Sequence, residues 1–98
     1  MEVSINIQKQ GRHLLIAACD SNLLGKTLKF GKIQFEVNES FYGGSCVSVE
    51  EAVSLMRDGT SVNIVGPVIV KKAIEKGLIH PQAVIDISGI PHALIVKV

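Results

Sequence analysis

The sequence has few aromatic residues, no tryptophan and little net charge. Aromatic residues make up 4% of the 98 positions, and ten Lys and Arg face nine Asp and Glu, which leaves a formal net charge of +1. A charge this close to zero excludes a surface that attracts nucleic acid through its total charge alone. The longest apolar runs, at residues 14–19 and 64–70, are well short of the about 20 residues that a membrane-spanning helix needs. We therefore expect no membrane partner.

Cysteine and histidine are also scarce. Cys19 and Cys46 lack the paired spacing of a disulfide framework or a zinc ribbon, so we expect two free thiols. The three histidines, His13, His80 and His92, have no partner at metal-ligand spacing, and we predict neither a metal nor a cofactor. The first residues carry no basic segment followed by an apolar one, as a signal peptide would, so the expected location is the cytoplasm.

What the sequence does contain is a large share of aliphatic residues. Hydrophobic residues make up 47% of the chain and charged residues 19%. This composition excludes intrinsic disorder. The length fits one globular domain, and we expect a single compact domain over residues 1–98.

Short alternating or apolar runs predict seven strands. They cover residues 3–8, 14–19, 27–30, 33–37, 61–65, 83–87 and 92–98. The first run alternates strictly, as in a strand with one wet face. The second is apolar on both faces, which is typical of a central strand covered on both sides. About one helical turn is expected between residues 20 and 25.

Two helices are predicted between these strands. Ser48 with Glu51 forms a capping box, and the apolar stripe that follows predicts a helix that ends at Gly59. A second helix begins at Gly66-Pro67. Two helices with seven strands indicate an α+β fold, a two-layer sandwich with a mixed, mostly antiparallel sheet and both main helices on one face.

Several groups of residues along the whole chain form a recognisable set. They are Ile5-Asn6-Ile7 with Gly11-Arg12, Leu24-Gly25-Lys26, Phe41-Tyr42-Gly43-Gly44, Asn63-Ile64-Val65-Gly66, His80-Pro81 with Ala83-Val84, and Gly89-Ile90-Pro91-His92-Ala93. In order and spacing this set resembles a family of short archaeal proteins, domain of unknown function number 424. The resemblance implies an archaeal cytoplasmic protein with a compact α/β fold and a link to the translation machinery. It supplies no catalytic residues.

The strongest candidate for binding is the segment Phe41-Tyr42-Gly43-Gly44, in a loop predicted at residues 38–47. The glycines allow the backbone to approach a ligand, and the rings could stack on a base. The alternative is that Phe41 fills the core beneath a turn. Adjacent side chains of an extended loop point in opposite directions, so we expect Phe41 to point inward and Tyr42 outward, where its phenol tolerates water.

Asn63 is a second candidate because its amide lies between apolar residues of a strand predicted to be buried. A buried amide must find hydrogen-bond partners. Asn63 therefore either pins the Phe41 loop or the Gly89 turn, or lines a site. Near it, Gly66 begins a helix whose free N–H groups at Val68 and Ile69 could receive an anion, unless it is only a helix start.

Lysines form two further groups. They are Lys26, Lys29 and Lys32 around the second predicted hairpin, and Lys71, Lys72 and Lys76 on the second helix. Such faces are usually only solvated. If both groups lay on one side of the sheet, they would form a basic patch that suits RNA.

The function expected from these features is a non-enzymatic binding module that docks on RNA or on a translation-related protein through residues 41–44 and nearby lysines. The alternative is a small-molecule-binding protein or enzyme, with a pocket near Asn63, Gly66, His92 and Cys46. A third hypothesis is a homodimer formed through an exposed strand edge.

Overall fold

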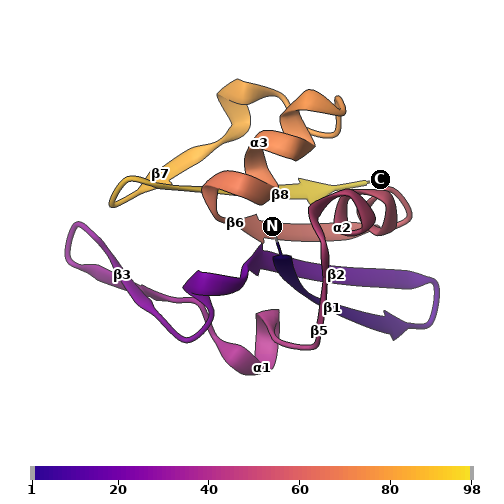
Figure 1. Ribbon diagram of the computed structural model, residues 1–98, viewed down its shortest axis with the longest axis horizontal. Helices are drawn as coiled ribbons and strands as arrows, with labels where there is room; N and C mark the ends of the chain where they lie inside the picture. The colour runs from indigo at the N-terminus through magenta and orange to yellow at the C-terminus, as the bar shows by residue number, and fades with distance from the viewer. Residues whose placement is uncertain (1, 98) are drawn as a thin grey trace.

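The protein is built around a mixed sheet of six strands, and the computed structural model describes residues 2–97. The strands lie in the order β5-β1-β2-β6-β8-β7 (Figure 1). In that order they are β5 (Ser45–Ser48), β1 (Glu2–Gln10), β2 (His13–Asp20), β6 (Ser61–Val65), β8 (Ile90–Val96) and β7 (Ile85–Ile87). β2 pairs in parallel with β6, and the other neighbouring pairs are antiparallel. The predicted mixed, mostly antiparallel sheet is confirmed.

Two helices, α2 (Val49–Met56) and α3 (Pro67–Glu75), cover one face of this sheet. Their apolar side chains meet those of β1, β2, β6 and β8 in the larger core, where Met56, Ile64 and Ile69 are almost fully buried. Ser48 begins α2 as predicted, since its Oγ accepts a hydrogen bond from the Glu51 amide at 3.1 Å. None of the helices within residues 2–97 is long and apolar enough to cross a bilayer. The α+β class with both main helices on one face is confirmed.

The opposite face of the sheet is covered over only part of its area. The cover consists of the 3₁₀ turn η1 (Ser21–Leu23), the hairpin of β3 (Thr27–Phe30) and β4 (Ile33–Glu36), and the short helix α1 (Glu39–Tyr42). A second, smaller core lies beneath it, in which Cys19 and Val65 meet Tyr42. β2 is therefore buried on both faces from residue 16 to 20, while Leu14 and Leu15 are only half-buried. The prediction of a strand covered on both sides is confirmed for its second half only.

The loop predicted at residues 38–47 is the main error in the expected fold. It contains α1, which Asn38 caps by accepting hydrogen bonds from the amides of Ser40 at 2.7 Å and Phe41 at 3.2 Å. It also contains β5, which has a single partly buried apolar side chain, Val47, and is defined by its pairing with β1. A strand of this kind has no local signal, because its hydrogen bonds to a distant segment are what make it extended.

The strand predicted at residues 83–87 is shorter than expected. Its first residues belong to or follow the 3₁₀ turn η2 (Pro81–Ala83), which His80 caps through a hydrogen bond from the Gln82 amide to Nδ1 at 3.1 Å. The last strand begins two residues before its predicted start, and its predicted end at Val98 lies outside the described residues.

Candidate functional site

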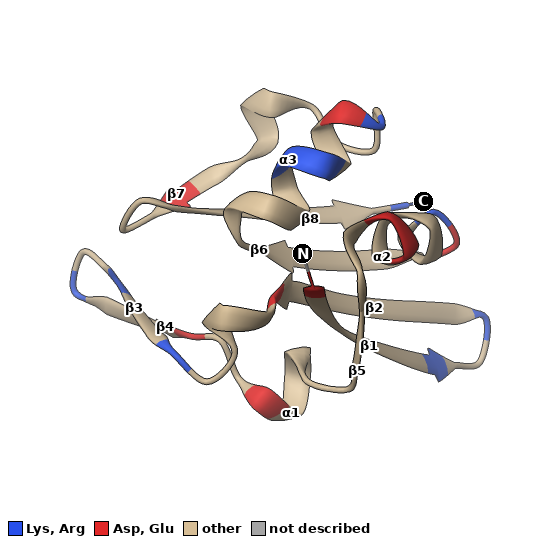
Figure 2. Cartoon of the chain, viewed as in Figure 1, with Lys and Arg blue, Asp and Glu red and all other residues tan. Residues whose placement is uncertain are grey.

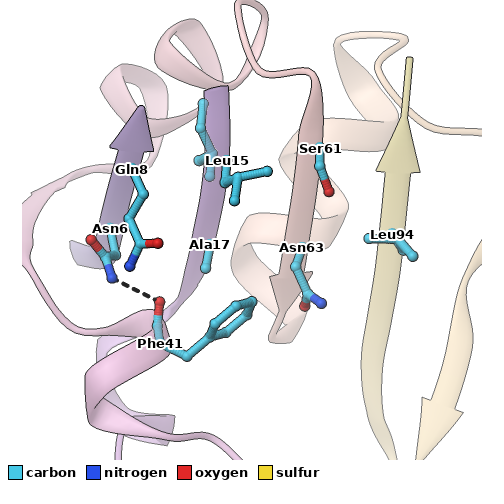
Figure 3. Close-up of a pocket in the computed structure, with 9 residues that line it drawn as sticks. Asn6, Gln8, Leu15, Ala17, Phe41, Ser61, Asn63 and Leu94 are labelled. Carbon is cyan, nitrogen blue, oxygen red and sulfur yellow. Dashed lines mark hydrogen bonds between the residues drawn. The ribbon is translucent and has the colours of Figure 1, made fainter. Parts of the chain in front are cut away.

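On the face of the six-stranded sheet opposite α2 and α3, the part that is not covered contains a hollow of about 110 Å³ (Figure 3). Its lining comes from four strands and α1. The residues are Asn6, Gln8, Leu15, Ile16, Ala17, Phe41, Ser61, Asn63 and Leu94. The floor is apolar, the polar groups are amides and one hydroxyl, and none of the lining residues is charged. A neutral, planar group with hydrogen-bonding edges suits this lining better than a phosphate does.

The register of the sheet brings these residues together. Ala17 pairs with Asn6 on one side and with Asn63 on the other, and Asn63 pairs with Leu94. Because alternate residues of a strand point to the same face, Gln8 follows Asn6 onto the open face. The strict alternation of β1 in the sequence predicted that these amides lie on a solvent-exposed face of the strand. It did not indicate that they line a site.

The two aromatic residues of α1 occupy the reverse of their expected positions. Tyr42 is 2% exposed and Phe41 is 48% exposed. The prediction of Phe41 inward and Tyr42 outward was wrong because the segment is a helix, and its rotation places Tyr42 over the smaller core. The Phe41 ring lies at the side of the hollow (Figure 3). It meets the Tyr42 ring edge-on, with ring centroids 4.9 Å apart.

Hydrogen bonds attach α1 to β1. The Ser4 hydroxyl donates to the Tyr42 carbonyl at 2.9 Å, and Asn6 Nδ2 donates to the Phe41 carbonyl at 3.1 Å (Figure 3). A Cβ atom at Gly43 would clash with the Glu39 carbonyl oxygen, and one at Gly44 with a carbonyl oxygen of β1. Gly44 is therefore accounted for by the close approach of this segment to the sheet, and Gly43 by the tight backbone at the end of α1.

Tyr42, Asn63 and His92 form a chain of hydrogen bonds beneath the hollow. The Tyr42 hydroxyl donates to Asn63 Oδ1 at 2.5 Å, and His92 Nε2 lies 2.9 Å from the same oxygen. An amide oxygen can only accept, so His92 donates from Nε2. Asn63 thus both pins the α1 segment and lines the hollow.

Burial sets the protonation of this chain. It lowers the pKa of His92, which favours the neutral ring at pH 7. Burial and, to a smaller extent, the nearby Cys19 raise the pKa of Tyr42 above its usual value, so its hydroxyl remains a donor. Phe35 packs edge-on against the His92 ring, with centroids 5.2 Å apart, and helps hold it in place.

The start of α3 does not offer an open anion site. The Asp20 carboxylate accepts hydrogen bonds from the Val68 amide at 2.9 Å and from the Ile69 amide at 3.0 Å. The Gly66 amide donates to the Pro91 carbonyl at 2.9 Å, and a Cβ at Gly66 would clash with Asp20. The hypothesis of an external anion was wrong because a buried carboxylate of the same chain fills the position.

The two lysine groups lie on different sides of the sheet. α3 carries Lys71 and Lys72 and packs in the larger core, whereas the β3–β4 hairpin packs against the smaller one. Lys72 Nζ also lies 3.5 Å from a carboxylate oxygen of Glu75 and 3.8 Å from one of Glu50. Figure 2 shows the basic residues of α3 well apart from those of the hairpin. The combined basic patch is not formed.

Cys46 and His92 do not converge. Cys46 lies on the edge strand β5, four strand positions from β8, which corresponds to about 19 Å at the usual strand spacing.

Burial, with smaller contributions from Asp20 and Cys46, raises the pKa of the Cys19 thiol to about 11. No cluster of three or more metal-ligating side chains is present in the part of the chain described. Of the residues in the pocket predicted around Asn63, Gly66, His92 and Cys46, only Asn63 lines the hollow; His92 contacts Asn63 from outside the lining, and Gly66 and Cys46 lie elsewhere.

Comparisons with known proteins agree with this description of the fold. Residues 7–98 match a sequence family described as "Protein of unknown function (DUF424)". A crystal structure of an uncharacterized conserved protein from Methanopyrus kandleri is 24% identical, with a TM-score of 0.85 over 97% of this chain and 90% of that chain. At this identity the likeness shows the fold alone. No curated protein matches the sequence.

Proposed function

The chain belongs to the DUF424 family of proteins of unknown function, and within that family we propose that its open sheet face binds single-stranded RNA. An unpaired base enters the hollow and stacks on Phe41, while the amides of β1 and β6 meet the edge of the base. The observation that carries this proposal is the half-exposed Phe41 ring beside an uncharged, amide-lined hollow. Stacking on aromatic rings with hydrogen bonds to base edges is the usual way in which proteins recognise unpaired bases.

The basic residues are consistent with a strand that passes over this face. Exposed basic residues lie at the β1–β2 turn, Arg12, and on the β3–β4 hairpin, Lys29 and Lys32. In Figure 2 this turn and the hairpin lie at opposite ends of the molecule. Positive charge at the ends and none in the hollow suits a base held in the middle with backbone phosphates on either side.

We propose that the protein binds RNA without catalysing a reaction on it. A thiol enzyme needs a nucleophile and a base within hydrogen-bond reach, and Cys46 and His92 lie far apart. The buried Cys19, with its raised pKa, is a poor source of thiolate. We include in the proposal that residues 1–98 act as one domain, in an archaeal cytoplasm and in contact with RNA of the translation apparatus.

The test is a titration of fluorescently labelled single-stranded RNA with wild-type protein and two variants at low salt. Phe41→Ala should weaken binding by about 1 to 3 kcal/mol because it removes the stacking surface. Ile7→Ala is the control, since Ile7 is 43% exposed, does not line the hollow, and points to the opposite face of the sheet from Asn6 and Gln8. Absence of RNA binding by the wild type, or an equal loss in both variants, would contradict the proposal.

The association with the translation apparatus needs a separate experiment. Tagged protein is sedimented with ribosomes from an archaeal lysate, with and without nuclease treatment. Co-sedimentation that nuclease abolishes supports an RNA contact. Retention after complete digestion would assign the contact to a ribosome-associated protein instead.

A further inference from the structure

We infer that Asn63 makes the hollow selective for uracil and guanine, which present the O4 or O6 carbonyl oxygen, over cytosine and adenine, which present the N4 or N6 amine at the same position. The inference rests on the proposed function, because it names the class of base that the same hollow accepts. It follows from the way in which Tyr42 and His92 hold the Asn63 amide.

The oxygen of this amide is already fully used. An amide oxygen has two lone pairs, and Asn63 Oδ1 accepts from the Tyr42 hydroxyl at 2.5 Å and from His92 Nε2 at 2.9 Å. Nothing among residues 2–97 accepts a hydrogen bond from Asn63 Nδ2. Asn63 lines the hollow, and its amide nitrogen is the group left for a ligand (Figure 3).

Both donors to the oxygen are themselves fixed. Tyr42 is buried at the end of α1, and its carbonyl is held by Ser4. The His92 ring is clamped by the edge-on contact with Phe35. In this arrangement the Tyr42 hydroxyl and His92 Nε2 both meet the amide oxygen, and burial, which keeps the phenol protonated, preserves the Tyr42 donor.

A locked amide reads bases differently from a free one. A free asparagine pairs with adenine through two bonds, donating to N7 and accepting from the N6 amine. Asn63 can only donate, so an amine placed against it would lose its own hydrogen bond. The O4 atom of uracil and the O6 atom of guanine accept instead. Gln8 and Ser61 carry both donors and acceptors and can adapt to the rest of the base edge.

The experiment compares short oligonucleotides of uridine and of cytidine, which are pyrimidines of the same size with similar stacking surfaces. The wild type should bind the uridine oligonucleotide roughly tenfold more tightly. Asn63→Asp places an acceptor where the amide nitrogen was, so the preference should reverse toward cytidine. Phe41→Ala is the matched control and should weaken both complexes while leaving their ratio unchanged.

A second variant keeps the test independent of how well Asn63→Asp folds. Tyr42→Phe removes one donor to Oδ1, so the ratio of the two affinities should fall toward one. Thermal melts establish that each variant is folded. Equal wild-type affinity for the two oligonucleotides, or tighter binding of cytidine, overturns the inference and leaves RNA binding intact. No binding of either one overturns the proposed function and the inference with it.

Discussion

Phe41 and Tyr42 are adjacent in α1 but have opposite surroundings, and their substitution should separate stability from binding. Tyr42→Ala opens a cavity in the smaller core and removes a hydrogen bond to Asn63, so it should lower the free energy of unfolding by about 3 to 5 kcal/mol. Phe41→Ala, at a half-exposed position, should cost less than about 1 kcal/mol. Urea denaturation measures both. Equal losses would mean that Phe41 is also part of the core.

His92 makes the stability of the fold depend on pH. Burial lowers its pKa below the usual 6.5, so the unfolded chain takes up the proton more readily than the folded one. The contribution of the neutral ring is therefore complete above pH 6.5 and decreases as the pH falls through 6.5 toward the pKa of the folded state. Urea midpoints on both sides of pH 6.5 should show this decrease.

The matched variant for this effect is His92→Gln, which keeps a side-chain N–H near Asn63 and has no titrating group. Its unfolding free energy should fall less than that of the wild type over the same pH range. A decrease as steep as that of the wild type would assign the effect to other groups.

At the scale of elements, α2 and α3 begin with caps of different strength. Ser48 supplies one exposed hydrogen bond to α2, and Ser48→Ala should cost about 1 kcal/mol. Asp20 satisfies two amides of α3, one of them buried, and Asp20→Ala should cost about 2 to 4 kcal/mol. Chemical denaturation compares the two variants. A smaller loss for Asp20→Ala would show that water can replace its carboxylate.

Local signals in the sequence predicted the elements that local interactions form. The Ser48 cap with its apolar stripe, the Gly66-Pro67 helix start and the alternation of β1 all lie within a few residues of what they stabilise. β5 and the role of Asp20 were missed for the opposite reason. β5 depends on pairing with β1, and Asp20 caps a helix 48 residues further along the chain.

Only two of the residues that line the hollow, Phe41 and Asn63, were selected from the sequence, each for its residue type and position. His92, also selected, contacts Asn63 from outside the lining. Cys46 was grouped with them wrongly, because strand order is a long-range property that no local pattern contains. The inward position of Tyr42 depended on a helix that only the Asn38 cap signals.

At the scale of the whole molecule, the small net charge limits how strongly salt should affect RNA binding. The three exposed basic residues at the ends of the open face, Arg12, Lys29 and Lys32, allow few phosphate contacts, and each contact on a single strand contributes about 0.7 to the slope of log affinity against log salt. We expect a slope no steeper than about −2. A titration series in salt measures it.

The lysines of α3 provide the control for this prediction. A double variant with Lys71→Glu and Lys72→Glu should leave the slope unchanged, because α3 lies on the opposite side of the sheet. A shallower slope in that variant would mean that RNA also contacts α3.

The single parallel pair in the sheet, β2 with β6, has a consequence for the time that the chain needs to fold. β1 with β2 and β6 with β8 are separate antiparallel units. The parallel pair that joins them aligns Leu15 with Ser61, so folding must close a loop of chain that later contains β3, β4, α1, β5 and α2. Closing that loop costs entropy before any of its contacts form, so this pairing should set the folding rate. In stopped-flow refolding, Ile64→Val at the seam should therefore slow folding, whereas Ile87→Val at the far edge should mainly speed unfolding.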